Sequence, residues 1–370
     1  APRIEERIEF LEHPAPYLAA LRELQSELSF SEGELELATD YARDGLNICE
    51  SHALDAPQRC RLIASIGKIH AAGGRLATAR DAFGSMLELA RDAGIPRLEA
   101  EALNSLGGVA GRSTDYQAAV DFFRASIAID RDLGDRATTG VKLANLGITF
   151  AAIGLYRRSE RYLRKALELH ELTGHAGLLN DAVIHLGEVV GELHDLEGAE
   201  AILDEAATVA HELGDLRSEL RAKNRRAKII LHRGAPERFS EAAALANEVY
   251  RHASRRGRPL RSAACRSLQV LAAIREHDGQ HSEAIRLARE ATILVRAGAA
   301  PVDGVLAIHH LGVLLTRAGR GDEGARLLGE AGRAVMRRLD SLTDPVLRHG
   351  YLEQAAVGRV LADAGFSTPD

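Results

Sequence analysis

Apolar and polar residues alternate along this chain with the spacing of amphipathic helices. Leu103, Leu106, Val109 and Ala110 are an example, because residues three, four or seven positions apart share one face of a helix. No stretch shows the sustained period-two alternation of a half-buried strand. The pattern therefore predicts an all-α protein without a sheet.

The pattern itself repeats every forty residues. One column of glycines stands at Gly67, Gly107, Gly147 and Gly187, and a second stands at 94, 134, 174 and 214. Within each period, polar turn residues separate two apolar stripes, and small residues recur at fixed points where two helices can approach closely. Two columns with one period indicate a tandem array in which each unit is a helix pair.

A family resemblance follows from the residues after the glycine. Leu106-Gly107 is followed by Tyr116 and then by the small residues Ala119 and Ser126, and the other units keep this order. The pattern resembles the tetratricopeptide repeat, which usually spans about 34 residues, with a longer second helix here. The resemblance implies a right-handed α-solenoid of antiparallel helix pairs. About eight units are expected, at residues 17–56, 57–96, 97–136, 137–176, 177–216, 217–259, 260–300 and 301–340.

Two units depart from the pattern, and a different segment follows the last one. The first unit has Glu27 in the glycine column and is degenerate, and the sixth has Ala227 there. Residues 341–353 resemble the closing segment of tetratricopeptide regions in large bacterial signalling proteins. Asp344 is expected to cap a last helix that has Pro345 in its first turn. We predict a solenoid over 1–343 and a capping helix with a tail over 344–370, in which Leu347, Leu352 and Val360 cover the open end.

The composition is that of an ordinary globular protein. Charged residues make up 27% of the chain and hydrophobic residues 46%. No apolar run approaches the roughly 20 residues of a membrane-spanning helix, and the first residues lack the pattern of a targeting peptide. Cys49, Cys60 and Cys265 lack metal-site spacing and leave one cysteine unpaired, which suits a reducing compartment. We expect a cytoplasmic protein.

Motifs of catalysis are missing from the sequence. It contains no glycine-rich phosphate loop, no nucleophile elbow and no zinc motif, so we predict a non-catalytic protein without a cofactor. His185, Glu188 and Glu192 share a predicted helix face, with His194 just beyond. This set is either a polar stripe lining a groove or a set of metal ligands, and the stripe is favoured.

The resemblance also implies where a partner binds. In tetratricopeptide arrays the first helix of each pair lines the concave surface, and partner peptides lie along it. The asparagines in these columns either pair with the backbone of an extended peptide or form hydrogen bonds within the solenoid. The predicted partner-binding residues are Lys68, Asn104, Asn145, His185, Glu188, Arg221, Asn224, Arg225, Lys228, Gln269 and His309.

Charge gives a second indication of the partner. Between positions 217 and 261 there are thirteen Lys and Arg against four Glu, although the whole chain has a net charge of −6. Arg221, Asn224, Arg225 and Lys228 form one helical stripe, which we expect to face the solvent and to bind an acidic segment. The alternative is a basic face that serves solubility alone. Nucleic acid is an unlikely partner, because the patch lacks interleaved aromatic residues.

Two function classes remain open after this reading. The favoured one is a non-catalytic scaffold that binds a protein or peptide in its concave groove, as part of a bacterial signalling or regulatory system. The alternative is a ligand- or peptide-sensing module of a transcription regulator or a multidomain signalling enzyme. The two differ in what fills the groove.

Overall fold

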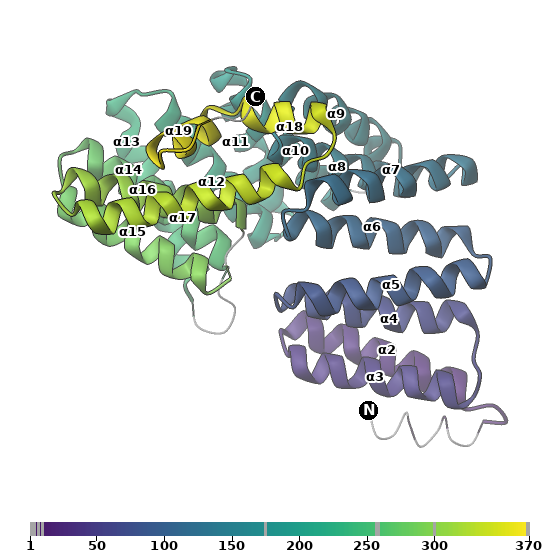
Figure 1. The fold of residues 1–370 in the computed structure, drawn as a ribbon. Coiled ribbons are helices and arrows are strands. Elements are labelled where there is room, and N and C mark those ends of the chain that lie inside the picture. The colour runs from purple at the N-terminus through teal and green to yellow at the C-terminus, as the bar shows by residue number, and fades with distance from the viewer. Residues whose placement is uncertain are drawn as a thin grey trace. The chain divides into compact units, whose positions relative to one another are not determined.

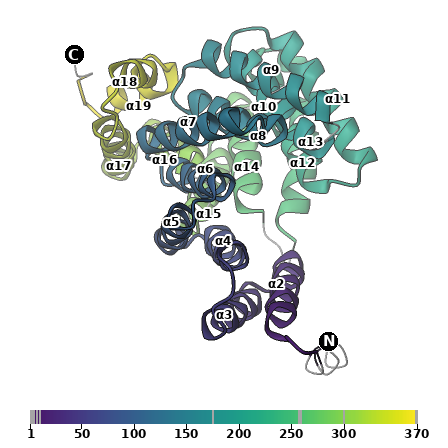
Figure 2. The same ribbon diagram turned by 90° about the vertical axis from the view of Figure 1, so that its right-hand side faces the viewer.

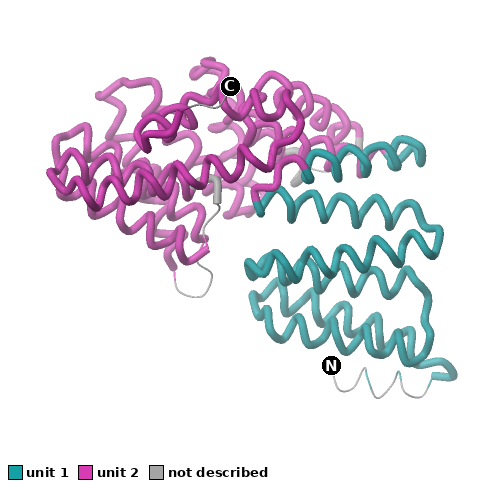
Figure 3. Tube along the Cα trace, viewed as in Figure 1, with its two compact units in different colours: residues 1–113, 118–135 teal, residues 114–117, 136–370 magenta. Residues whose placement is uncertain are grey.

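In the computed structural model, which describes residues 5, 8, 11–173, 176–255, 260–298 and 301–367, every regular element is a helix (Figure 1). The prediction of an all-α chain is confirmed. The helices belong to two compact units, each of which is described by itself (Figure 3). Unit 1 comprises residues 1–113 and 118–135, and unit 2 comprises residues 114–117 and 136–370.

The helices follow one another as antiparallel pairs. The first helices of the pairs are α2 (Ala15–Glu32), α4 (Ala56–Ala72), α6 (Pro96–Arg112), α8 (Arg136–Ala152), α10 (Ala176–Glu192), α12 (Leu216–His232), α14 (Arg261–His277) and α16 (Pro301–Arg317). The second helices are α3 (Leu35–Ser51), α5 (Leu76–Asp92), α7 (Tyr116–Leu133), α9 (Tyr156–Thr173), α11 (Leu196–Glu212), α13 (Phe239–Ala253), α15 (His281–Arg296) and α17 (Gly321–Asp340). A 3₁₀ turn, η1 (Pro236–Arg238), precedes α13, and α18 (Pro345–Leu352) and α19 (Ala355–Asp363) end the array.

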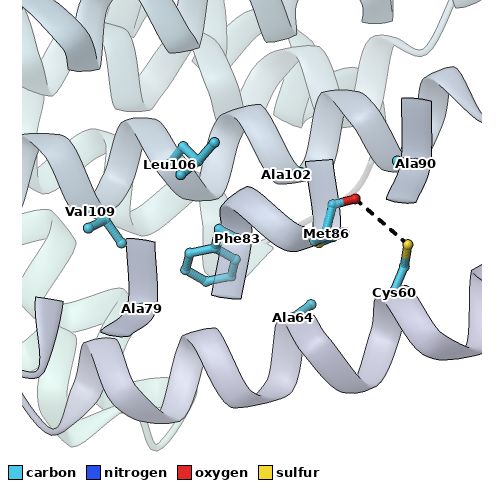
Figure 4. Packing of buried hydrophobic residues seen from close by; sticks show 9 residues of the cluster. All are labelled: Cys60, Ala64, Ala79, Phe83, Met86, Ala90, Ala102, Leu106 and Val109. Carbon is cyan, nitrogen blue, oxygen red and sulfur yellow. Dashed lines mark hydrogen bonds between the residues drawn. The ribbon is translucent and has the colours of Figure 1, made fainter. Parts of the chain in front are cut away.

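Unit 1 shows how one helix pair packs on the next. Phe83 and Met86 of α5 lie between α4 and α6, where they contact a cluster that includes Cys60, Ala64 and Leu106 (Figure 4). Phe83 is 3% exposed and Met86 is fully buried. In this cluster the second helix, α5, supplies the large side chains of Phe83 and Met86, and α4 supplies the small side chain of Ala64. This division lets helix backbones approach closely without leaving voids.

The glycine column lies at this packed interface, as the sequence predicts. A Cβ atom added to Gly107 would lie 2.7 Å from the ring of Phe123, and one added to Gly147 would lie 3.0 Å from Leu163 Cγ. Each partner stands sixteen positions after its glycine, and the same spacing joins Gly67 to Phe83, Gly187 to Leu203 and Gly312 to Leu328. The second helix therefore fills the space that the missing side chain leaves.

The first unit departs from the alignment by one position. Glu27, which the sequence alignment places in the glycine column, is exposed. Ser26 is fully buried instead, and its hydroxyl donates to the carbonyl of Ala38 at 2.8 Å. The predicted column residue of the first unit is wrong, because α2 begins 41 rather than 40 residues before α4.

In unit 2 the first helices form an inner layer. Helix α12 contacts both α10 and α14, and the series continues to α8 on one side and α16 on the other. The second helices pack mainly against the first helices of their own pair and of the next pair. When helix pairs stack along a curve, the helices on the inner side are closer to one another than those on the outer side. The first helices, which contact one another from pair to pair, therefore lie on the inner side. Figure 2 shows this stack turned by 90°.

The C-terminal helices end the array. Asp344 caps α18 by accepting a hydrogen bond from the Val346 amide at 2.8 Å, with Pro345 in the first turn, as predicted. Leu347 and Val360 are buried, and α19 packs against α16 and α17. The boundary between solenoid and cap at 343/344 stays a prediction. Among the described residues, no helix is both long and apolar enough to cross a membrane.

Candidate binding surface on the inner helices of unit 2

Two neighbouring inner helices carry opposite charges at matching positions. Helix α10 presents Asp181, His185, Glu188 and Glu192, spaced by four, three and four residues and therefore on one face. Helix α12 presents Arg221, Arg225 and Lys228 at the positions that follow forty residues after Asp181, His185 and Glu188. The acidic face of one unit thus lies beside the basic face of the next.

These side chains form a ladder of ion pairs. Arg221 Nη1 donates to Asp181 Oδ1 at 2.5 Å, and Lys228 Nζ donates to Glu192 Oε1 at 3.0 Å. Between them, Arg225 pairs with Glu188. We call the six residues Asp181, Glu188, Glu192, Arg221, Arg225 and Lys228 the inner ladder. It joins the fifth and sixth helix pairs along their inner face.

The inner ladder corrects the prediction of a solvent-facing basic stripe. Arg225 is 6% exposed and Asn224 is 3% exposed. The Asn224 amide donates to the carbonyl of Ala263 at 2.8 Å and to Ser267 Oγ at 3.2 Å, which are bonds within the solenoid. The expectation was wrong because it weighed the like charges of one helix alone. Carboxylates of the preceding helix offset the cost of burying Arg225.

His185 lies at the centre of the inner ladder. Its Nε2 is 2.9 Å from Arg221 Nη2, which can only donate, so this nitrogen of the imidazole is an acceptor. Burial lowers the pKa of His185 well below its ordinary value, and Arg225, Arg221 and Arg266 lower it further. His185 is therefore neutral near pH 7.

Residues of the neighbouring helices α9 and α14 also act on the inner ladder. Arg266 of α14 is close enough to lower the pKa values of both His185 and Arg221. Burial raises the pKa of Glu192, but the nearby Lys228 outweighs it and holds this pKa below its ordinary value. Tyr156 of α9 also forms a hydrogen bond with Glu192.

The remaining predicted residues lie in different surroundings. Gln269 of α14 donates to Cys265 Sγ at 3.4 Å, and His309 of α16 lies 2.7 Å from a carboxylate oxygen of Asp363. Asn145 on α8 is half-buried. Lys68 and Asn104 belong to unit 1, where Lys68 is 3.9 Å from Glu101. The structure therefore brings His185, Glu188, Arg221, Asn224, Arg225 and Lys228 together.

Three residues of this surface, Asp181, Glu192 and Arg266, were not among the partner-binding residues predicted from the sequence. A signal for the first was present, because Asp181 stands forty residues before Arg221 in the repeat alignment. Within the described residues, no group of three His, Cys, Asp or Glu side chains is arranged to hold a metal ion. The three cysteines are buried and unbonded to one another.

A second charged cluster joins the same two helix pairs. Glu200 of α11 accepts hydrogen bonds from Arg238 at 2.5 Å and from Arg233 at 2.9 Å, and Arg226 pairs with Asp204 at 2.6 Å. These residues line a surface depression of about 300 Å³. Hydrogen bonds from Arg238 are the main cause that lowers the pKa of Glu200 to about 2. The cluster ties α11 to the irregular start of the next second helix.

Glu200 is expected to make stability depend on pH. Its folded pKa of about 2 lies below the unfolded value of 4.5, so its contribution is complete above pH 4.5 and is lost as pH falls toward 2. We expect Glu200→Gln to lower the free energy of unfolding by about 2 kcal/mol at pH 7, allowing for solvent screening, and by progressively less below pH 4.5. Urea unfolding across this range measures the difference. The exposed neighbour Glu197→Gln is the control, and an equal loss at every pH would contradict the assignment.

The helix pairs, their forty-residue period and the inner layer define an α-solenoid. The family model of the tetratricopeptide repeat matches residues 98–171, so this part of the chain consists of tetratricopeptide repeats. A search of curated protein sequences finds no match.

Several solved structures share the fold. A Rap protein complexed with Competence and Sporulation Factor aligns with a TM-score of 0.64 and 14% identity over 92% of each chain. The apo form of RapI aligns with a TM-score of 0.59 and 16% identity over 76% of this chain and 99% of the other. The apo form of the quorum sensor NprR from B. thuringiensis gives a TM-score of 0.58 and 11% identity over 92% and 91%. At these identities the likeness concerns the fold.

Proposed function

We propose that the inner surface of unit 2 binds an extended, acidic segment of another protein, without catalysis. The observation that carries the proposal is the row of cations on this surface, in which Arg221 and Lys228 remain 26% and 38% exposed on either side of the buried Arg225 and the neutral His185. A carboxylate from a partner would bind to the exposed parts of Arg221 and Lys228. Guanidinium groups bind carboxylates with two parallel hydrogen bonds, which adds geometric selectivity.

The ion pairs at the two ends of the inner ladder can exchange their own carboxylate for one from a binding partner. The side chains of Arg221 and Lys228 are 26% and 38% exposed, and Asp181, which pairs with Arg221, is 52% exposed. Exposed ion pairs contribute little to stability, so an incoming carboxylate can replace Asp181 at small cost. The buried Arg225 and Asn224 instead hold the helices in place. Recognition is thus assigned to Arg221 and Lys228.

Peptide binding tests this proposal directly. The probe is a fluorescent library of nine-residue peptides with Asp or Glu at every second position, compared with a library carrying Asn or Gln there. We expect Arg221→Gln combined with Lys228→Gln to weaken binding of the acidic library at least tenfold, which equals about 1.4 kcal/mol. Binding should also weaken as salt rises, because exposed charges are screened over roughly 10 Å at 0.1 M.

Matched controls separate binding from folding. Arg164→Gln with Lys165→Gln removes two exposed cations from the outer helix α9 and should leave affinity unchanged. Circular dichroism confirms that each variant is folded. Equal affinity of the parent protein for the acidic and the neutral library, with no response to salt, would refute the proposal.

A second candidate function is a sensing module within a regulatory system. It is supported by the similarity over 92% of the chain to a Rap protein in complex with Competence and Sporulation Factor, and by the likeness to a quorum sensor. A sensing module changes conformation when its ligand binds, whereas a scaffold keeps its inner helices in place. Hydrogen exchange of α10 and α12 with and without the acidic library distinguishes the two.

A further inference from the structure

The C-terminal segment makes contacts that the rest of unit 2 does not. Between α8 and α17, each helix pair packs on its neighbours in sequence. Residues 344–354, in contrast, reach the turn between α8 and α9 and the start of α7, about two hundred residues earlier in the chain. Gln354 Nε2 lies 3.4 Å from the carbonyl oxygen of Ala152, and the backbone amide of Asp344 donates to Gln117 Oε1 at 3.0 Å. The rings of Tyr351 and Tyr116 are 6.5 Å apart.

The same segment also contacts the last helix pair. A Cβ atom added to Gly332 of α17 would lie 2.6 Å from Ala364 and 2.7 Å from the ring of Phe366. His309 of α16 lies 2.7 Å from Asp363, and Arg348 donates to the carbonyl of Leu339 at 3.0 Å. The segment is therefore attached to both the first and the last helix pair of unit 2.

Two glycines make the contact with the first pair possible. Gly154, in the turn between α8 and α9, has a φ of +83°, and a Cβ atom on it would lie 2.6 Å from the carbonyl oxygen of Gly350. On the other side, a Cβ atom on Gly350 would lie 2.7 Å from Leu155 Cγ. The two backbones are closer than side chains allow, so this contact is specific to the residues present.

We propose that residues 344–366 act as a latch, which closes unit 2 by joining its last helix pair to its first and so sets the spacing of the inner helices. A solenoid with only nearest-neighbour contacts changes pitch through many small adjustments. Closure by the latch removes this freedom, because the two ends can no longer separate. Release of the latch lets the inner helices spread. This device goes beyond the proposed binding function and does not depend on it.

The latch is tested with Gly350→Glu, which places a charged side chain against Leu155. Gly358→Glu is the matched control, since it makes the same change in α19 where no atom lies within 4 Å of an added Cβ. Spin labels at Arg164→Cys on α9 and Arg326→Cys on α17 report the distance between the two ends. We expect one narrow distance for the parent and for Gly358→Glu, and a broader, longer distribution for Gly350→Glu.

Hydrogen exchange gives an independent readout. Amides at 153–155 should exchange at least about tenfold faster in Gly350→Glu than in Gly358→Glu, because opening exposes this turn. A milder variant, Gln354→Glu, replaces the side-chain donor to the carbonyl of Ala152 with an acceptor. It provides the test of the latch if Gly350→Glu does not fold. Unchanged distances and exchange in both latch variants would overturn the proposal.

Discussion

Replacing Arg225 with glutamate is expected to destabilise unit 2 by about 3–5 kcal/mol, the cost of breaking a buried ion pair. Arg225 is 6% exposed and pairs with Glu188, whose side chain is 28% exposed. The substitution places two carboxylates against each other in a site that excludes most water. Neutral His185 cannot offset their repulsion at pH 7. Urea unfolding followed by circular dichroism measures the loss.

Two further variants make this prediction specific. The exposed residue Arg217 lies on the same helix, and Arg217→Glu should change the free energy of unfolding by no more than about 0.5 kcal/mol. Exchanging the charges, with Glu188→Arg and Arg225→Glu together, should recover part of the loss because the pair is restored in reverse. A loss below about 1 kcal/mol for Arg225→Glu, or no recovery in the exchange, would show that the pair does not hold the two helices together.

The sequence predicted the fold because helix pairs are specified locally. The spacing of Leu103, Leu106 and Val109 and the recurrence of a glycine at the position of Gly107 in most units follow from contacts within one pair or between adjacent pairs. Such contacts repeat with the period of the array, so they can be read from one sequence. The exception at Ser26 has the same origin, because a single added residue shifts the column.

The inner ladder was not predicted because charges were counted along one helix. Arg221, Arg225 and Lys228 read as a free basic stripe when α12 is considered alone. Their carboxylate partners stand 36 to 40 residues earlier on α10, and only the alignment of two units brings them together. The excess of cations between positions 217 and 261 is largely matched in this way, and also by Glu200 and Asp204 of α11.

The contact between the C-terminal segment and the turn after α8 could not be predicted from the sequence, for a different reason. Gln354 and Ala152 are separated by 202 residues, and no repeated pattern links them. Their meeting depends on the curvature accumulated over five helix pairs, and each pair contributes only a small rotation. Asp344 and Pro345 could be identified as a helix start, whereas the place where that helix binds could not.

Introducing a large side chain into the glycine column is the second change with a large expected effect. Gly147→Leu should lower the free energy of unfolding by about 1–3 kcal/mol, because an added Cβ would already lie 3.0 Å from Leu163 Cγ and 3.3 Å from the carbonyl of Ser159. Leu163 is fully buried, so it cannot move into solvent without losing its own packing. Thermal and urea unfolding measure the loss.

The sequence itself suggests how the loss from Gly147→Leu can be relieved. In the α14–α15 pair the two aligned positions are Ala272 and Ala288, both buried, so the column accepts a larger residue when its partner is smaller. Combining Gly147→Leu with Leu163→Ala should therefore recover part of the stability, while Leu163→Ala alone should be destabilising through the cavity it leaves. Gly108→Leu is the control, since nothing lies within 4 Å of an added Cβ at this exposed helical position. If Gly147→Leu unfolds like the parent protein, or if Leu163→Ala brings no recovery, the pairing of each glycine with the residue sixteen positions later does not determine how these helices pack.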